Sequence, residues 1–212
     1  LEFRRVLFRS AAIDAALTAC DLVLGGQAGA YAACRPPGHH AAGSLYGGSC
    51  YLNNAAVAAQ YLRDHGIERV AVLDIDAHHG NGTQEIFFDR ADVFFGSVHV
   101  DPARGWFPHF LGFAPERGAG AGLGANRNLP LAPGAGDDEW LAGVQRLVDE
   151  ARASSPGALV VSLGVDAAEG DPESPLRVTQ SGFDAAGRAL AGVGVPTVFV
   201  QEGGYDLTLL GD

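Results

Sequence analysis

Basic residues are scarce in this sequence, and their scarcity excludes one large class of partners. The 212 residues include 14 Lys and Arg against 25 Asp and Glu, a formal net charge of −11. A protein that binds nucleic acid without regard to sequence needs a basic face to displace counterions. We therefore expect no nucleic-acid partner, whereas a cationic substrate is compatible with the acidic balance.

Cysteine is also rare, and long apolar runs are missing. Cys20, Cys34 and Cys50 are odd in number and form no CxxC pair, which predicts neither a disulfide framework nor a cysteine-based zinc site. Buried free thiols in a reducing cytosol are expected instead. No apolar run reaches the roughly 18 residues of a membrane-spanning helix. Together these absences predict a cytoplasmic protein without membrane contact.

The length and composition fit one globular domain. Apolar residues make up 47% of the chain, and 212 residues suffice for a single sizeable core. Residues 1–10, LEFRRVLFRS, contain three Arg and are followed by no signal-peptide pattern. We interpret residues 1–10 as a non-native scar segment and residues 11–212 as the folded core.

Short β-branched runs alternate with helical stretches along this core. The predicted strands cover residues 70–73, 93–98, 158–163 and 197–200. The predicted helices cover residues 11–24, 51–64, 137–153 and 180–191. This alternation predicts an α/β domain with a mainly parallel sheet and helices on both faces. The Gly- and Pro-rich stretch 112–136 is expected to be a long active-site loop.

Polar clusters follow the predicted strands. LDIDAHHGNG, SLGVDAAEGD and QEGGY begin at or just beyond strand ends, and SVH closes another strand. Ligands of open parallel sheets bind at the carboxyl edge, so these segments predict one shared site.

Asp74, Asp76 and His78 alternate with apolar residues. If the strand continued that far, all three would lie on one face. Carboxylates and an imidazole suit Zn²⁺, and Asp166 would add a third ligand to Asp76 and His78 while leaving a position open. The alternative is a polar strand end whose aspartate caps the next helix.

His39 and His40 follow a Pro-Pro-Gly turn, and Tyr205 follows two glycines. Adjacent imidazoles in a rigid loop can serve one reacting centre, one as a base and one held cationic. The alternative for the histidines is a surface pair or an adventitious metal site, and the alternative for Tyr205 is a tyrosine packed in the core.

Five segments, taken together, resemble the histone deacetylase superfamily. RPPGHHA, GGSCYLNNAA, LDIDAHHGNGTQ, SLGVDAAEGDP and QEGGYDL occur in the family's order from about residue 31 to residue 205. HVDP and the glycine-rich stretch after it resemble the bacterial branch of acetylpolyamine amidohydrolases and class II-like deacetylases. The resemblance implies an arginase/deacetylase-like α/β fold and a zinc-dependent amidohydrolase with one Zn²⁺ per chain.

The resemblance also implies roles for individual residues. Asp76, His78 and Asp166 match the zinc ligands. The matched catalytic residues are His39, His40, Asp74, Asn81 and Tyr205. Asp74 would orient His39, and Asn81 would partner His40 where other branches have an aspartate. Tyr205 would bind the substrate carbonyl.

The implied substrate contacts are Gly48, Phe107 as a tunnel wall, and Gly204. Ser49 stands where many lysine deacetylases have an opposing Phe. A structural K⁺ site is implied near Asp74, Asp76, His78 and Ser97.

The expected substrate is a small acetylated amine, with acetylpolyamines favoured by the acidic charge. A protein acetyl-lysine deacetylase would share these residues, and an inactive fragment could keep the fold and metal site. Family members are longer, so a core truncated at both ends is expected, from a full-length protein that could be a homodimer. Fe(II) fits much the same ligands as zinc.

Overall fold

The computed structural model describes the backbone of residues 2–208 and the side chains of residues 9–208. Within this part, six strands form one parallel sheet in the order β1-β6-β5-β2-β3-β4. The strands are β1 Gly29–Ala32, β2 Val70–Asp74, β3 Val93–Val100, β4 Asn126–Leu131, β5 Ala158–Leu163 and β6 Thr197–Gln201. The helices are α1 Glu2–Leu24, α2 Asn54–Asp64, α3 Asn81–Phe87, α4 Asp137–Ala153 and α5 Gln180–Ala191.

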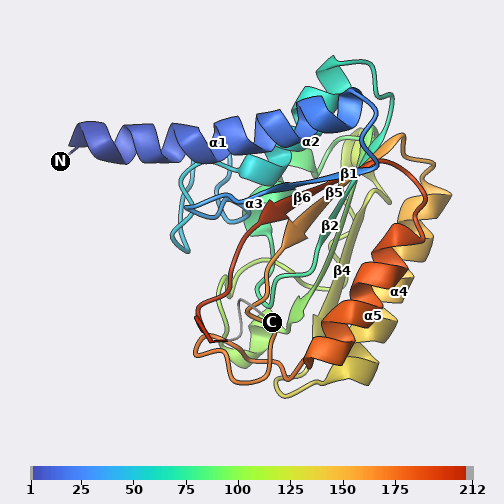
Figure 1. Ribbon diagram of the computed structural model, residues 1–212. Coiled ribbons are helices and arrows are strands. Elements are labelled where there is room, and N and C mark those ends of the chain that lie inside the picture. Colours follow the sequence, from blue (N-terminus) through green and yellow to red (C-terminus); the bar gives the residue numbers. More distant parts are fainter. Residues whose placement is uncertain (1, 209–212) are drawn as a thin grey trace.

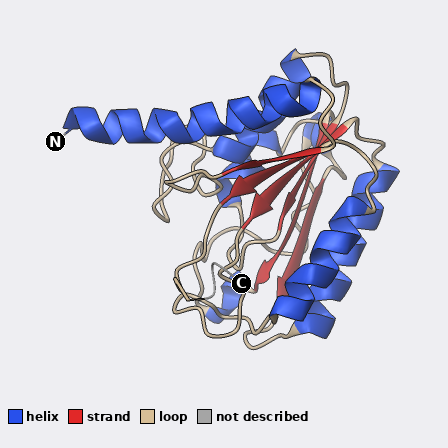
Figure 2. Ribbon diagram, viewed as in Figure 1, coloured by secondary structure: helices blue, strands red, loops and turns tan. Residues whose placement is uncertain are grey.

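Helices cover the sheet on both faces (Figures 1 and 2). The central strand β2 shows why: Val70 and Val72 pack into the core beneath α1 and α2, while Ala71 and Leu73 pack into the core beneath α4 and α5. Successive side chains of a strand point to opposite faces, so a strand buried on both sides is apolar throughout. The predicted fold class is confirmed.

The helix boundaries follow from local capping. Asn53 is the N-cap of α2, because its side chain accepts a hydrogen bond from the amide of Ala56 at 2.9 Å. Thr179 caps α5 in the same way through the amide of Gly182 at 3.3 Å. Such a cap satisfies a backbone donor at the first turn that has no partner within the helix.

Three expectations about the elements were wrong or incomplete. The stretch 112–136 is not one loop, because it contains β4, the sheet's edge strand. Pro130 and the polar residues of β4 are not typical of the apolar runs that predict strands. An edge strand tolerates both. Strand β1 and helix α3 were also not predicted.

The amino-terminal helix is longer than the pattern from residue 11 indicates. The backbone of residues 2–10 continues α1, whose first half projects beyond the rest of the molecule in Figure 1. The interpretation of residues 1–10 as non-native stays a prediction. None of the described helices combines the length and apolarity that a membrane crossing requires. Cys20, Cys34 and Cys50 are buried free thiols, as expected.

Candidate active site

The end of β2 and the loop that follows it carry three residues of the site, and hydrogen bonds to two of their carboxylates set the path of the loop. β2 ends at Asp74, so the expected extension of the strand through His78 is wrong. The amide of Asp76 instead donates to Oδ1 of Asp74 at 3.2 Å, and the amide of His78 donates to Oδ1 of Asp76 at 2.8 Å. These bonds fold the chain into a turn. The turn, and not the two-residue period of a strand, places Asp76 and His78 on the same side.

Asp76, His78 and Asp166 meet at the carboxyl edge of the sheet. Nδ1 of His78 lies 3.0 Å from Oδ2 of Asp166 and 3.3 Å from Oδ1 of Asp76. One donor atom from each residue lies within 4.8 Å of the other two. Asp166 follows β5 and is held by the amide of Ala77, which donates to its Oδ1 at 2.9 Å. Two strand ends thus contribute to one cluster.

The cluster fits a zinc ion. Tetrahedral zinc with nitrogen and oxygen bonds of about 2.0–2.1 Å places neighbouring ligands about 3.3 Å apart. The distances of 3.0 and 3.3 Å from Nδ1 of His78 to the oxygens of Asp166 and Asp76 are close to that spacing. Asp76 and Asp166 are almost fully buried at 1% and 0% exposure, and a positive charge between two adjacent buried carboxylates stabilises their ionised forms.

The pKa shifts within the cluster also indicate a site that attracts positive charge. Burial disfavours the imidazolium of His78, but hydrogen bonds to Asp166 and Asp76 outweigh burial and raise its pKa to about 10. Burial raises the pKa of Asp166 to about 7, and the charge of Asp76 adds to that rise. The protein therefore places cation-seeking oxygens around one point.

Glycines bring two backbones close to these carboxylates. A Cβ at Gly164 would overlap the carboxylate of Asp76, and a Cβ at Gly203 would overlap those of Asp76 and Asp166. The amide of Gly203 donates to Oδ2 of Asp76 at 2.9 Å. Glycine is required where a backbone approaches this closely.

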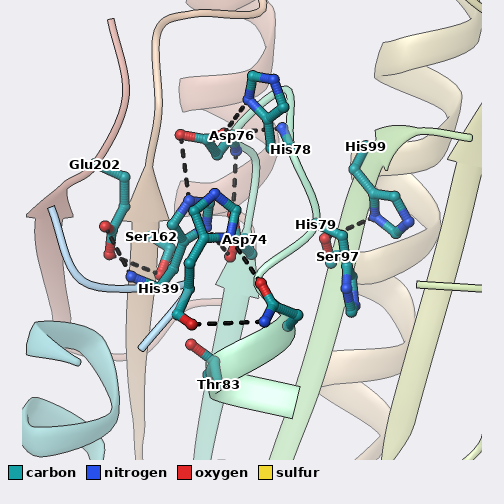
Figure 3. Close-up of polar contacts among 12 residues, drawn as sticks. His39, Asp74, Asp76, His78, His79, Thr83, Ser97, His99, Ser162 and Glu202 are labelled. Carbon is teal, nitrogen blue, oxygen red and sulfur yellow. Dashed lines mark hydrogen bonds and ion pairs between the residues drawn. The ribbon is translucent and has the colours of Figure 1, made fainter. Parts of the chain in front are cut away.

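The paired histidines are buried, which excludes the surface-pair alternative. His39 and His40 are 2% and 6% exposed, and their ring centroids lie 3.9 Å apart. Nδ1 of His39 lies 2.9 Å from Oδ2 of Asp74, and its Nε2 lies 3.8 Å from Oδ2 of Asp76 (Figure 3). Nδ1 of His40 lies 2.8 Å from Oδ1 of Asn81.

Their surroundings separate the two imidazoles electrostatically. Burial opposes the charge on His39, but Asp74 and Asp76 outweigh it and hold the pKa of His39 well above its usual range. Burial and the charge of His39 hold the pKa of His40 well below its usual range. Because Oδ1 of Asn81 accepts from Nδ1 of His40, Nε2 is left as the acceptor. One ring is cationic and the other is a neutral base.

Gly48 and Phe107 lie against His40. Phe107 packs edge-on, with ring centroids 4.7 Å apart and planes at 87°. Gly48 has a φ of 52°, and a Cβ there would overlap the His40 ring. Ser49 is exposed with a φ of 62°, so it adds no aromatic wall opposite Phe107.

Tyr205 is half exposed at 47%, which excludes the buried-core alternative. Burial raises the pKa of its phenol, and the charges of Asp76 and Asp166 raise it further, so the group remains a donor. Gly204, with a φ of 138°, precedes it. The amides of Tyr205 and Asp206 donate to Oδ2 of Asp171 at 2.7 and 3.0 Å.

Ser97 lies beside Asp74, as expected for neighbouring strands. The two are register partners in the β2–β3 pairing. Ser97 Oγ lies 2.8 Å from Nδ1 of buried His99.

Sequence reasoning missed two carboxylates, Glu202 and Asp171, although both lie in segments it singled out. Glu202 is 5% exposed beneath the histidine loop, and Asp171 is 7% exposed beneath the Tyr205 loop. Their position directly within QEGGY and AAEGDP was the available signal. His79, the second histidine of the pair at residues 78–79, points away and bonds Gln84 at 3.1 Å and Asn128 at 3.2 Å.

Fold and site together define a parallel α/β protein with a carboxylate–imidazole metal cluster at the carboxyl edge of the sheet. The family model described as the histone deacetylase domain matches residues 5–212. The chain belongs to the histone deacetylase domain family.

Three relatives show the range of the similarity. Acetylpolyamine amidohydrolase 1 of Pseudomonas aeruginosa is 50% identical over 92% of this chain and 56% of that protein. Acetylpolyamine amidohydrolase of Mycoplana ramosa is 47% identical over 92% of this chain and 57% of that protein. The crystal structure of acetylpolyamine aminohydrolase from Burkholderia pseudomallei superposes with a TM-score of 0.90 at 49% identity, covering 93% of this chain and 57% of that one. The chain thus spans a little over half the length of these relatives.

Proposed function

We propose that this chain carries the active site of a zinc-dependent amidohydrolase that removes acetyl groups from primary amines, with acetylpolyamines as its substrates. One observation carries the proposal. The Asp76–His78–Asp166 cluster lies beside a buried histidine pair whose Nδ1 atoms face Asp74 and Asn81. An electrophilic metal beside a positioned base is a combination suited to hydrolysis of an unactivated amide.

Zinc held by Asp76, His78 and Asp166 would supply Lewis acidity toward the acetyl carbonyl. His40 is neutral, and its Nε2 would take a proton from the attacking water and pass it to the leaving nitrogen. General acid–base catalysis of this kind contributes about 10²–10⁴ in rate. His39, cationic beside Asp74, stabilises negative charge that develops nearby. The water oxygen bonds to the carbonyl carbon, the C–N bond breaks, and acetate and a free amine result.

Tyr205 would donate a hydrogen bond to the carbonyl oxygen as it becomes an oxyanion. Its raised phenol pKa keeps the proton available at neutral pH. Phe107 and Gly48, which pack against His40, form one wall of the approach to the base.

Two observations favour acetylpolyamines as substrates. The net charge of −11 attracts a cationic amine. The relatives at 50% and 47% identity carry the name acetylpolyamine amidohydrolase. A protein acetyl-lysine substrate would use the same catalytic residues. The choice between the two substrate classes therefore depends on comparing how fast each is turned over.

The test is acetate release by the zinc-loaded chain from N-acetylputrescine and from an acetyl-lysine peptide at equal concentrations. We expect higher kcat/KM for N-acetylputrescine. A higher value for the peptide would transfer the assignment to a lysine deacetylase. Stoichiometric zinc binding without acetate release from either substrate would show that the chain keeps the metal site but not the activity.

Several finer features belong to the same proposal. Comparing the activity of the chain loaded with Fe(II) and with Zn²⁺ tests which of the two metals the site uses. A K⁺ site at the backbone of Asp74, Asp76, His78 and Ser97 is supported by the β2–β3 register, and activity titrated with KCl tests it. A cytoplasmic location and a homodimer of the whole protein are proposed as well, the latter tested by sedimentation.

A further inference from the structure

A buried carboxylate outside the metal cluster connects two loops of the site. Glu202 directly follows β6 and is 5% exposed. Its Oε2 accepts hydrogen bonds from the amides of Gly38 at 2.6 Å and His39 at 3.1 Å. Its Oε1 accepts from Oγ of Ser162 at 3.4 Å (Figure 3). The segment that precedes Tyr205 is thereby bonded to the turn that carries the histidine pair.

Two consecutive amides bonded to one oxygen define the orientation of the turn. Buried backbone donors need partners, and a charged acceptor makes the stronger bonds. The direction of the Gly38–His39 peptide sets where the His39 side chain leaves the backbone. That side chain then reaches Asp74 at 2.9 Å and lies 3.8 Å from Asp76.

On the side opposite Glu202, the Gly38–His39 turn packs closely against neighbouring backbone. A Cβ at Gly38 would overlap the amide of Asn54 and the carbonyl of Leu52, so the turn packs directly on the start of α2. Nδ2 of Asn54 also donates to the carbonyl of Pro36 at 3.1 Å. The turn is therefore held between α2 and Glu202, and removal of Glu202 releases one side only.

Charge complements this geometry. Burial raises the pKa of Glu202 to about 7, and in its charged form Glu202 adds to Asp74 and Asp76 in favouring the cationic form of His39. The next residue, Gly203, holds Oδ2 of Asp76 through its amide at 2.9 Å. One stretch of two residues thus contacts both the histidine turn and a metal-cluster carboxylate.

We propose that Glu202 is a positioning residue, which holds the Gly38–His39 turn so that both imidazoles face the Asp76–His78–Asp166 cluster. Only the kinetic consequence rests on the proposed deacetylase function. The positioning itself is a property of the folded chain and is measurable without turnover.

The experiment compares Glu202→Gln and Glu202→Ala with the parent chain. Hydrogen exchange of a peptide spanning residues 36–42, followed by mass spectrometry, reports on the turn. We expect the Gly38 and His39 amides to exchange about tenfold faster in both variants, because a charge-assisted acceptor is lost. Ser162→Ala removes only the bond to Oε1 and should leave this exchange within about twofold. Glu68→Gln, an exposed carboxylate elsewhere, is the matched charge control.

Kinetics separate positioning from general damage to the fold. We expect Glu202→Gln to lower kcat by about 10- to 100-fold with KM within about twofold, since a small misplacement of a catalytic group costs that much. Zinc content should stay at one per chain. A variant that lost zinc or raised KM in parallel would show only a structural role and would count against the proposal.

Exchange at Gly38 and His39 within twofold of the parent in Glu202→Gln would overturn the inference. If Glu202→Ala does not fold, Glu202→Gln decides alone, since it keeps the size of the side chain. If the parent chain shows no turnover, the proposed function fails while the exchange measurement still decides the role of Glu202.

Discussion

Single atoms decide the chemistry of this site, and the histidine pair illustrates it. His39 and His40 are neighbours in the chain with ring centroids 3.9 Å apart. A carboxylate faces one ring and an amide oxygen faces the other. The charged acceptor favours the protonated form of its imidazole, whereas burial and that positive charge favour the neutral form of the second ring. Two identical side chains therefore take opposite protonation states.

At this scale Tyr205→Phe removes one hydroxyl and little else. We expect kcat to fall by about 10²–10³, the cost of losing an oxyanion donor, with KM changed by less than about threefold. Steady-state kinetics on N-acetylputrescine measure both constants. A variant with raised KM and unchanged kcat would remove the oxyanion role from Tyr205.

Asp166→Asn tests the metal cluster through a single oxygen. The amide is neutral and a weaker ligand, so we expect zinc affinity to fall by at least about 10-fold. Competition with a chromogenic chelator measures it. Asp171→Asn is a useful comparison, because it alters a buried carboxylate near Tyr205 without touching the cluster. Equal zinc affinity in the parent and Asp166→Asn would remove Asp166 from the ligand set.

Loops at the ends of strands, more than the strands, assemble the site. Asp76 and His78 lie beyond the end of β2, and the loop is curled by hydrogen bonds to its own carboxylates. The loop after β6 is tied down by Asp171, whose Oδ2 accepts from the amides of Tyr205 and Asp206. Each loop thus contains or meets a carboxylate that satisfies its free amides.

Asp171→Asn should therefore affect the Tyr205 loop as an element. An amide oxygen is a weaker acceptor than a carboxylate, so the loop should loosen without changing the metal ligands. We expect kcat to fall by roughly 10-fold, with zinc stoichiometry unchanged. Steady-state kinetics and metal analysis of the same preparation test it. Full activity in this variant would show that the Tyr205 loop keeps its position without Asp171.

The whole molecule is a three-layer sandwich, and a buried polar network joins strand β3 to the stretch that precedes β4. His99 on β3 bonds Ser97 at 2.8 Å and the carbonyl of Gly112 at 2.9 Å, with no exposure to solvent. Burial lowers the pKa of His99 to about 4. Its protonation is thus linked to global stability.

The sign of that linkage follows from the two states. Unfolded His99 has a pKa near 6.5 and binds a proton below it, whereas the folded form stays neutral down to about pH 4. Stability from this residue is present above pH 6.5 and is lost as pH falls toward 4. Between pH 7.5 and 5 the loss is about 2 kcal/mol. Urea unfolding at both pH values should show a smaller loss in His99→Gln, and an equal loss would contradict the linkage.

Much of this architecture could be predicted from residues alone, because the signals are local. Helices at residues 137–153 and 180–191 and the strand at residues 158–163 have the predicted bounds. Apolar periodicity and capping residues determine the bounds of such elements, and both signals lie within the element or next to it in the sequence. Strand β4 escaped because Pro130 and its polar residues resemble a loop, and only pairing with β3 makes it a strand.

The candidate residues were also available in the sequence, since carboxylates, histidines and glycines cluster after strands that must share one edge. What the sequence by itself determined was the composition of the site and the parallel sheet that gathers it. Only the tertiary structure decided which oxygen faces which nitrogen, that Asp76 and His78 come together through a turn, and that Glu202 supports the histidine loop. These contacts join residues up to 164 positions apart, and no local pattern encodes the meeting of two such distant side chains.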